Sequence, residues 1–224
     1  MSAEHPALAG LYDVPWATVE HAYGPATDVP SLLVALTGSR DQQERAVYEL
    51  HGNIWHQGTV YEATAYAVPF LARLVLTEPP PLRDELMNLV ANIATGSSYL
   101  DVHQHLVRDG LSDEEDAAME KELAYVRAAR DAVHDWLPDL IAKVLANQTP
   151  GALVLICRLA AAYPDDKDRF TEPLQWMWEN VHDLRLRAAL GIALARRGEP
   201  AEYSDDVLCD LFYDLDASPQ TDDT

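Results

Sequence analysis

Apolar residues recur at helical spacing in one segment after another along this chain, and proline, glycine or capping residues separate the segments. Leu86, Leu89 and Ile93, for example, share one helical face. No segment shows the sustained alternation of apolar and polar residues that marks a half-buried strand. We therefore predict an all-α protein. Helices are expected over residues 29–36, 40–54, 59–74, 82–94, 117–147, 150–162, 167–180, 182–197 and 204–215.

Two predicted helices carry an aspartate followed four residues later by an arginine and then by small residues, and two contain a Val-Pro pair before apolar residues. The residues of this pattern are Val29, Pro30, Leu32, Leu33, Asp41, Arg45, Ala46, Val68, Pro69, Phe70, Leu71, Asp183, Leu186, Arg187, Ala189, Leu190 and Ala193. In these features the chain resembles the HEAT-repeat and HEAT-like (phycobiliprotein-lyase-type) repeat family over about residues 29–95 and 118–197. The resemblance implies a curved stack of helix pairs whose concave face binds another macromolecule, usually a protein.

The spacing of the helices predicts the domain organisation. Antiparallel helix pairs at about 35–45 residues per pair are typical of an α-solenoid. We expect one right-handed superhelical domain over residues 1–224, with about four to five HEAT-like helix pairs. Residues 1–28 are expected to form an N-terminal cap, residues 95–117 an exposed insertion and residues 216–224 a frayed acidic tail.

The negative net charge of the chain disfavours some classes of binding partner. The formal net charge is −21, from 37 acidic and 16 basic residues with histidine counted as neutral. A chain this acidic repels phosphate backbones and anionic membranes, so we expect neither nucleic acid nor a membrane as partner. Some HEAT-like proteins are DNA-repair glycosylases that hold duplex DNA in a basic groove, and the charge argues against that branch. The one dense basic cluster consists of Arg185, Arg187, Arg196 and Arg197.

Cysteine usage and the N-terminus favour a cytoplasmic protein. Cys157 and Cys209 lie far apart in apolar helical runs, where a buried reduced thiol is the usual state. The N-terminal residues lack the basic start and apolar core of a signal peptide, and no run approaches the roughly 18 apolar residues of a membrane helix. No nucleophile motif, Gly-rich phosphate loop or CxxC pair is present, so we predict no catalytic residue and no cofactor.

The densest window of aromatic, imidazole and amide groups covers residues 46–74, AVYELHGNIWHQGTVYEATAYAVPFLARL. It is expected to end one helix and turn sharply into the next, with Gly58 left-handed and Thr59 and Glu62 as a capping box. Aromatic side chains at such a turn suit recognition, because they bury a large area and keep a polar tip. The alternative to recognition, for each aromatic residue taken individually, is that it packs between helices. The predicted binding residues are Tyr48, His51, Asn53, Trp55, His56, Gln57, Tyr61, Glu62 and Tyr66.

A small metal-dependent or acid–base enzyme is the alternative function, with a cleft built from residues 51–62 and 99–105. His51, His56 and Glu62 combine two imidazoles with a carboxylate, a set that binds Zn²⁺ or transfers protons. However, residues five apart do not stack on one helical face, and Glu62 is already expected to cap a helix. We therefore assign no metal ligand.

Two other features give weaker indications of function. Asp101, His103 and His105 include two histidines two residues apart, which can share a metal but are more often polar loop residues. The acidic run at residues 113–116 could meet a basic partner, but a solvated helix N-terminus explains it better.

Together with the resemblance, these features predict a non-catalytic protein-binding module or scaffold that uses its concave face and the hairpin at residues 48–66. The negative surface would steer a basic protein partner to that site. By analogy alone, an inhibitory or immunity-type role toward a basic effector protein fits the size and charge of the chain.

Overall fold

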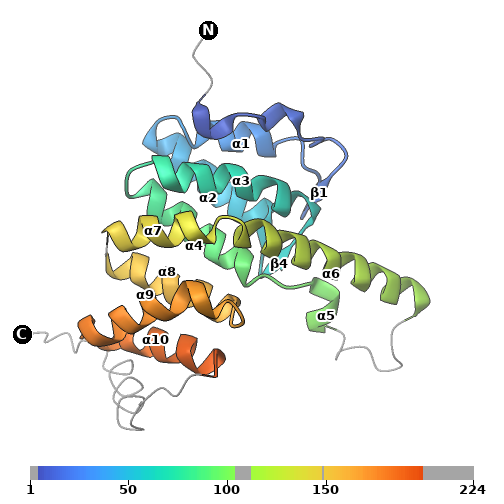
Figure 1. The fold of residues 1–224 in the computed structure, drawn as a ribbon. Helices are drawn as coiled ribbons and strands as arrows, with labels where there is room; N and C mark the ends of the chain where they lie inside the picture. Colours follow the sequence, from blue (N-terminus) through green and yellow to red (C-terminus); the bar gives the residue numbers. More distant parts are fainter. Residues whose placement is uncertain (1–4, 104–111, 148, 199–224) are drawn as a thin grey trace, which may run out of the picture. The chain divides into compact units, whose positions relative to one another are not determined.

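Helices account for 72% of the described residues and strands for 5% in a computed structural model of the protein, which confirms the predicted, mostly helical fold. The structure describes residues 5–103, 112–147 and 149–198 (Figure 1). The chain divides into two compact units, Met1–Lys143 and Val144–Thr224, and each is described in turn. The organisation of the whole chain as one repeat domain stays a prediction.

The first unit contains two helix pairs that contact each other. Its helices are η1 (Pro6–Leu8), η2 (Leu11–Asp13), α1 (Val29–Ala35), α2 (Arg40–Asn53), α3 (Glu62–Thr77), α4 (Leu82–Ala94), α5 (Tyr99–His103), α6 (Asp113–His134) and the start of α7 (Leu137–Asn147), where η marks a short 3-10 helix. Helix α1 packs on α2 and α3 packs on α4, while α1 also contacts α3 and α2 contacts α4. Helix α6 lies against α3 and α4 (Figure 1).

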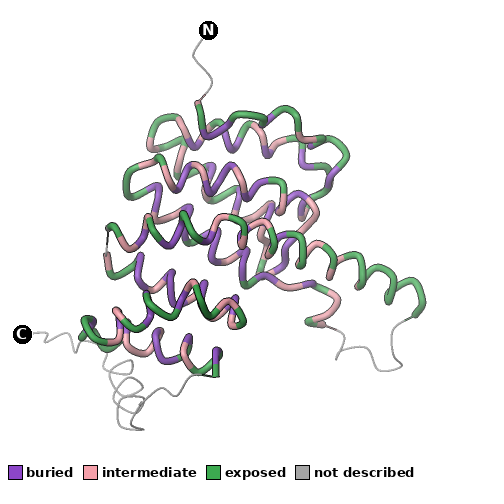
Figure 2. The backbone as a smooth tube through the Cα atoms, viewed as in Figure 1, coloured by how far each residue is buried: buried purple, intermediate pink, exposed green. Residues whose placement is uncertain are grey.

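Local sequence signals explain the start and the packing face of α2. The backbone N–H of Ser39 donates to Gln42 Oε1 (2.8 Å), which confirms the capping box expected at this helix start. The predicted apolar face is buried, with Ala46, Leu50 and Ile54 at most 1% exposed. Figure 2 shows buried residues alternating mainly with half-buried ones along α3, whereas the first half of α6 is largely exposed.

Two antiparallel hairpins of two-residue strands interrupt the helices of the first unit. Strand β1 (Glu20–His21) pairs with β2 (Gly24–Pro25), and β3 (Trp55–His56) pairs with β4 (Thr59–Val60). Strands this short show no alternation of apolar and polar residues, so the periodicity of the sequence indicates neither of them. The second hairpin corrects the helix start predicted at residue 59, because α3 begins at Glu62.

The N-terminal segment before α1 packs along α3. Trp16 is buried, its indole N–H donates to Leu11 O (2.7 Å), and its ring centroid lies 6.3 Å from that of Phe70. The Arg73 guanidinium lies over the Phe70 ring, 4.8 Å from its centroid, and donates to Ala9 O (3.0 Å). These contacts anchor the segment on the helix that follows the candidate site.

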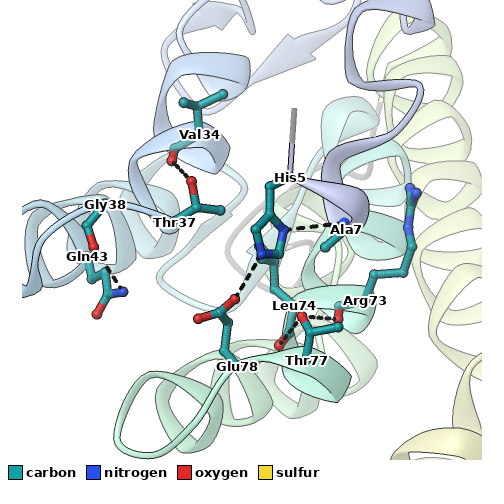
Figure 3. Close-up of polar contacts among 10 residues, drawn as sticks. All are labelled: His5, Ala7, Val34, Thr37, Gly38, Gln43, Arg73, Leu74, Thr77 and Glu78. Atoms are coloured by element: carbon teal, nitrogen blue, oxygen red, sulfur yellow. Dashed lines mark hydrogen bonds and ion pairs between the residues drawn. The ribbon is translucent and has the colours of Figure 1, made fainter. Parts of the chain in front are cut away.

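Figure 3 shows how the start of this segment reaches the C-terminal end of α3. His5 Nδ1 accepts a hydrogen bond from Ala7 N (3.3 Å), which leaves the proton on Nε2 to face Glu78 Oε1 (3.3 Å). In the same view, Thr77 Oγ1 donates to the carbonyl of Arg73 (2.9 Å). His5 therefore connects the first 3-10 helix to the end of α3.

Helices α6 and α7 correct the long helix predicted over residues 117–147. Helix α6 begins at Asp113, so the acidic run lies in its first turn, where carboxylates interact favourably with the helix dipole. Ser112 caps this turn, and its N–H and hydroxyl both donate to Glu115 Oε2 (2.8 and 2.9 Å). Pro138 is the second residue of α7, where its missing N–H costs nothing, so the helix breaks before this proline.

The second unit contains α8 (Pro150–Ala162), α9 (Lys167–Asn180) and α10 (Leu184–Arg196). Both α8 and α9 pack on α10, and most residues of the apolar helix α8 are buried, as predicted. Gly198 has a left-handed φ of 69° just after α10, as expected for a helix terminator. The predicted helix at 204–215, Cys209 and the predicted tail at 216–224 lie outside the described residues.

Cys157 is the buried thiol that its apolar surroundings predict. It is 2% exposed, and burial raises its pKa to about 12. Because the thiolate is the reactive form, the native thiol stays protonated and unreactive at about pH 8. We expect iodoacetamide at this pH to modify Cys157 only after denaturation, as measured by peptide mass spectrometry. Rapid modification of Cys157 in the native protein would contradict its burial.

Candidate binding site

A tight β-hairpin joins α2 to α3 at the centre of the predicted site. Gln57 and Gly58 both have positive φ angles (52° and 94°), as in a two-residue type I′ turn. His56 pairs with Thr59 across this turn. The left-handed conformation predicted for Gly58 is confirmed, whereas the direct turn from helix to helix is wrong.

Thr64, and not Thr59, provides the hydroxyl at the start of α3. Thr59 lies in β4, so the predicted capping box of Thr59 and Glu62 is wrong. Instead, Tyr61 N donates to Thr64 Oγ1 (2.8 Å), and the same hydroxyl donates to Ile54 O (2.6 Å) after α2. Thr64 is 0% exposed. One buried hydroxyl therefore closes the base of the hairpin.

A polar network holds the β1–β2 hairpin on the end of α2. Ala22 N donates to Asn53 O (3.0 Å), and Asn53 Nδ2 donates to Asp28 Oδ2 (2.7 Å). His21, 8% exposed, faces Asp28 Oδ1 through Nε2 (2.8 Å) and accepts from Tyr23 N at Nδ1 (3.0 Å). Because both nitrogens of His21 are occupied, this imidazole positions the turn and is not free to act as a base.

This network brings Tyr23 against His56 of the second hairpin. Tyr23 Oη lies 3.3 Å from His56 Nδ1, and the two ring centroids are 5.5 Å apart with an interplanar angle of 71°. Such edge-to-face geometry is favourable for aromatic pairs. Tyr23 nevertheless stays 68% exposed. Its ring is therefore held in place while most of its surface faces solvent.

The residues after α4 attach the second hairpin to α6. Ser97 N donates to Gly58 O (2.8 Å), and Val60 N donates to Ser97 O (3.2 Å). The next residue, Ser98, is 1% exposed, and its hydroxyl donates to Glu122 Oε2 on α6 (2.6 Å). The carboxylate of Glu122 is thereby fixed beside the hairpin.

Burial and neighbouring charge shift two pKa values at this site. Burial raises the pKa of Tyr61, and electrostatic repulsion from Glu122 and Tyr23 raises it further. Burial lowers the pKa of His51, whose ring meets that of Trp55 edge-on, with centroids 5.8 Å apart. Both groups are therefore neutral at neutral pH, which favours contact with apolar surface over proton transfer.

The predicted binding residues differ in exposure. Tyr48 on α2 and Tyr66 on α3 are 80% and 41% exposed, and Gln57 is exposed at the turn. The half-buried members are His51, Asn53, Trp55, His56, Tyr61 and Glu62. The structure adds Tyr23 and Glu122 to this group, and both come from segments outside the predicted window. Tyr-Gly-Pro after β1 is a turn signal that could have drawn attention to Tyr23.

The first candidate metal set consists of His51, His56 and Glu62, and the structure does not assemble these residues into a metal site. In residues 5–103, 112–147 and 149–198, no three His, Cys, Asp or Glu side chains come together in a way that could hold a metal ion. His51 packs on Trp55 and His56 on Tyr23, so the two imidazoles have different neighbours. The metal-dependent version of the enzyme hypothesis therefore has no assembled ligand set within these ranges.

The second candidate metal set consists of Asp101, His103 and His105, and the structure describes only part of it. His103 stacks on Tyr99 with ring centroids 4.3 Å apart, and its Nδ1 lies 2.8 Å from Tyr99 O. His105 lies outside the described residues. His103, one described member of this set, thus makes a local contact within α5.

Two arginines of the basic cluster have structural partners within the second unit. The Arg187 guanidinium lies over the Trp178 ring, 4.6 Å from its centroid. Arg197 is 4% exposed and donates to Asp166 O (3.2 Å) and Lys167 O (3.1 Å). The cluster therefore offers less accessible positive charge than its sequence indicates.

Comparisons with protein-family models, with curated proteins and with solved structures find no match for this chain. Among the helices of the described ranges, none has both the length and the apolar character needed to cross a membrane. Because the comparisons find no match, the function is inferred from the geometry of the site.

Proposed function

We propose that this protein is a non-catalytic binding module, built from HEAT-like helix pairs, that recognises another protein. Its recognition surface, which we call the hairpin surface, consists of Tyr23, His56, Gln57, Tyr61, Glu62 and Glu122. One observation carries the proposal. Two β-hairpins interrupt a helical unit and present aromatic and imidazole groups, and hydrogen bonds to neighbouring elements fix both hairpins.

Fixed aromatic groups suit protein recognition because ordering a mobile side chain costs binding free energy. Tyr23 is held through its backbone N–H by His21 and through its hydroxyl by His56. Tyrosine also combines a large apolar area with a polar tip, which makes it a frequent hot-spot residue at interfaces. The hairpin surface can therefore bury area on a partner with little loss of side-chain entropy.

Helix contacts in the first unit support the HEAT-like part of the proposal. Each repeat of an α-solenoid packs on its neighbours. The helix pair α1–α2 packs on the pair α3–α4 in this way, because α1 contacts α3 and α2 contacts α4. In the second unit, Asp183 of the HEAT-like motif accepts a hydrogen bond from Leu186 N (3.0 Å) and caps α10.

The charge of the chain favours a basic partner. A net charge of −21 attracts basic proteins and raises their rate of association, most strongly at low ionic strength. An inhibitory or immunity-type role toward a basic effector protein is consistent with this attraction.

Affinity capture from a lysate of the cells that produce the protein tests the proposal. We expect the native chain to retain one partner in stoichiometric amount. The Tyr23→Ala/His56→Ala variant should lose it, because the substitutions remove contact area at the hairpin surface. The matched control is Tyr12→Ala/His182→Ala, which removes an exposed tyrosine (73%) and an exposed histidine elsewhere and should retain the partner.

Circular dichroism should show equal helical content in the native chain and both variants. Loss of the partner in both variants, or in neither, would refute the hairpin surface as the binding site. Failure of the native chain to retain any partner would count against the binding function itself.

A further inference from the structure

We propose that the hairpin surface binds an arginine side chain of a basic protein partner, and this inference rests on the proposed binding function. The guanidinium would stack on the Tyr23 ring and pair with the carboxylates of Glu62 and Glu122. The position of these groups, the balance of charge around them and the second carboxylate oxygen of Glu122 favour such a ligand.

A continuous set of contacts places Tyr23 and Glu122 at the same edge of the first unit. Tyr23 contacts His56 in the second hairpin (3.3 Å), and Ser97 pairs with the β4 side of that hairpin. The adjacent Ser98 then binds Glu122 (2.6 Å). Strand β1 also contacts α3, and β4 contacts α6. Two hairpins and two helices therefore meet around one aromatic and acidic surface.

The described residues at this edge include more carboxylates than cations. The Lys121 ammonium lies over the Tyr125 ring, 5.7 Å from its centroid. Tyr125 raises the pKa of Lys121 most, and the charges of Glu20 and Glu62 add to the effect. Among the described residues, Lys121 thus lies near two carboxylates, and the charge of a third, Glu122, acts on Tyr61 of the same surface. The excess of negative charge attracts one further cation to the edge.

Within the part of the chain that the structure describes, one oxygen of Glu122 is available for a ligand. Its Oε2 accepts hydrogen bonds from Ser98 Oγ (2.6 Å) and Leu100 N (2.9 Å), whereas its Oε1 has no partner within the described ranges. The residue is half-buried. A carboxylate fixed through one oxygen can offer the other for a charge-assisted hydrogen bond with little further ordering cost.

Arginine fits this surface better than lysine does. A guanidinium stacks on an aromatic face and pairs with carboxylates through a planar set of donors, whereas an ammonium is more strongly hydrated. The contact with His56 holds the Tyr23 ring in place, and Tyr23 remains 68% exposed to receive a flat ligand. The surface therefore provides the stacking and the charge pairing that arginine can use together.

An NMR titration of the full chain tests this inference. The probe is a blocked Gly-Gly-Arg-Gly-Gly peptide, and two control peptides replace its arginine with lysine or with citrulline, which keeps the shape without the charge. We expect saturable shifts of the Tyr23 and His56 ring signals with the arginine peptide. Binding should be weaker with the lysine peptide and absent with the citrulline peptide.

Variants identify the groups that bind the probe. Glu62→Gln should weaken binding of the arginine peptide by about two- to fivefold, the range for one partly exposed ion pair. Tyr23→Ala should abolish it. Glu114→Gln, in the first turn of α6, changes the net charge equally and should leave the affinity unchanged. Equal weakening by Glu62→Gln and Glu114→Gln, or equal binding of the citrulline peptide, would overturn the inference.

The two experiments have distinguishable outcomes. If capture depends on the hairpin surface but the arginine peptide does not bind there, protein recognition stands and the arginine inference fails. If the arginine peptide binds at Tyr23 and Glu62 but the native chain captures no partner, the arginine subsite stands and the proposed function fails.

Discussion

Replacing Thr64 with valine is expected to lower the free energy of unfolding by about 2–3 kcal/mol, because it leaves buried backbone groups unpaired. Valine keeps the shape of the side chain but removes the hydroxyl. That hydroxyl accepts from Tyr61 N (2.8 Å) and donates to Ile54 O (2.6 Å) in a fully buried position. Urea unfolding followed by far-UV circular dichroism measures the loss.

Thr77→Val is the matched control for this prediction. Thr77 lies in the same helix, but it is exposed, and its hydroxyl bonds to the carbonyl of Arg73 (2.9 Å). We expect this substitution to change stability by less than about 0.5 kcal/mol. Hydrogen exchange should place the loss caused by Thr64→Val in the hairpin between α2 and α3. Equal effects of the two substitutions would show that Thr64 does not hold the hairpin.

Helix ends with strong local signals can be predicted from the sequence alone. Helices α4 and α9 begin and end at the predicted residues, because prolines and polar residues mark both boundaries within a few positions. The capping box of Ser39 and Gln42 is a signal of the same kind. These features depend on neighbours along the chain, so a window of sequence contains the information needed.

The β3–β4 hairpin depends on contacts that no such window contains. Its strands are two residues long, and the hydroxyl of Ser97, which bonds to Gly58 O, lies 39 residues further along. The capping rule selected Thr59 and Glu62, but strand pairing occupies Thr59, and the buried Thr64 takes over at the helix start. Long-range pairing therefore overrides the local preference at this point.

The candidate site could be predicted only in part, because long-range contacts complete it as well. The window around His56 contains the residues contributed by α2, the hairpin and α3. Tyr23 meets His56 from 33 residues away, and Glu122 binds Ser98 from 24 residues away. Both reach the site through the packing of separate elements. Periodicity and turn signals describe each element singly and do not show which elements meet.

Gly96→Ala is expected to lower the free energy of unfolding by about 1–3 kcal/mol through overpacking. Gly96 is buried between the end of α4 and the second hairpin. A Cβ atom at this position would overlap Val60 Cγ1 and lie 3.1 Å from the Ile93 carbonyl oxygen. Val60 is 1% exposed and so has little room to move. Urea unfolding again measures the change, and hydrogen exchange should show the loss in β4 and after α4.

Gly52→Ala provides a control of opposite sign. Gly52 lies in α2, and a Cβ atom there meets no atom within 4 Å, so alanine should raise stability by about 0.5–1 kcal/mol through its helix preference. If Val60 Cγ1 is the obstacle at Gly96, Gly96→Ala should cost less in a Val60→Ala background, with a coupling of about 0.5–2 kcal/mol. Additive costs would show that Val60 does not limit the space, and the Ile93 carbonyl would then be the group that excludes a side chain.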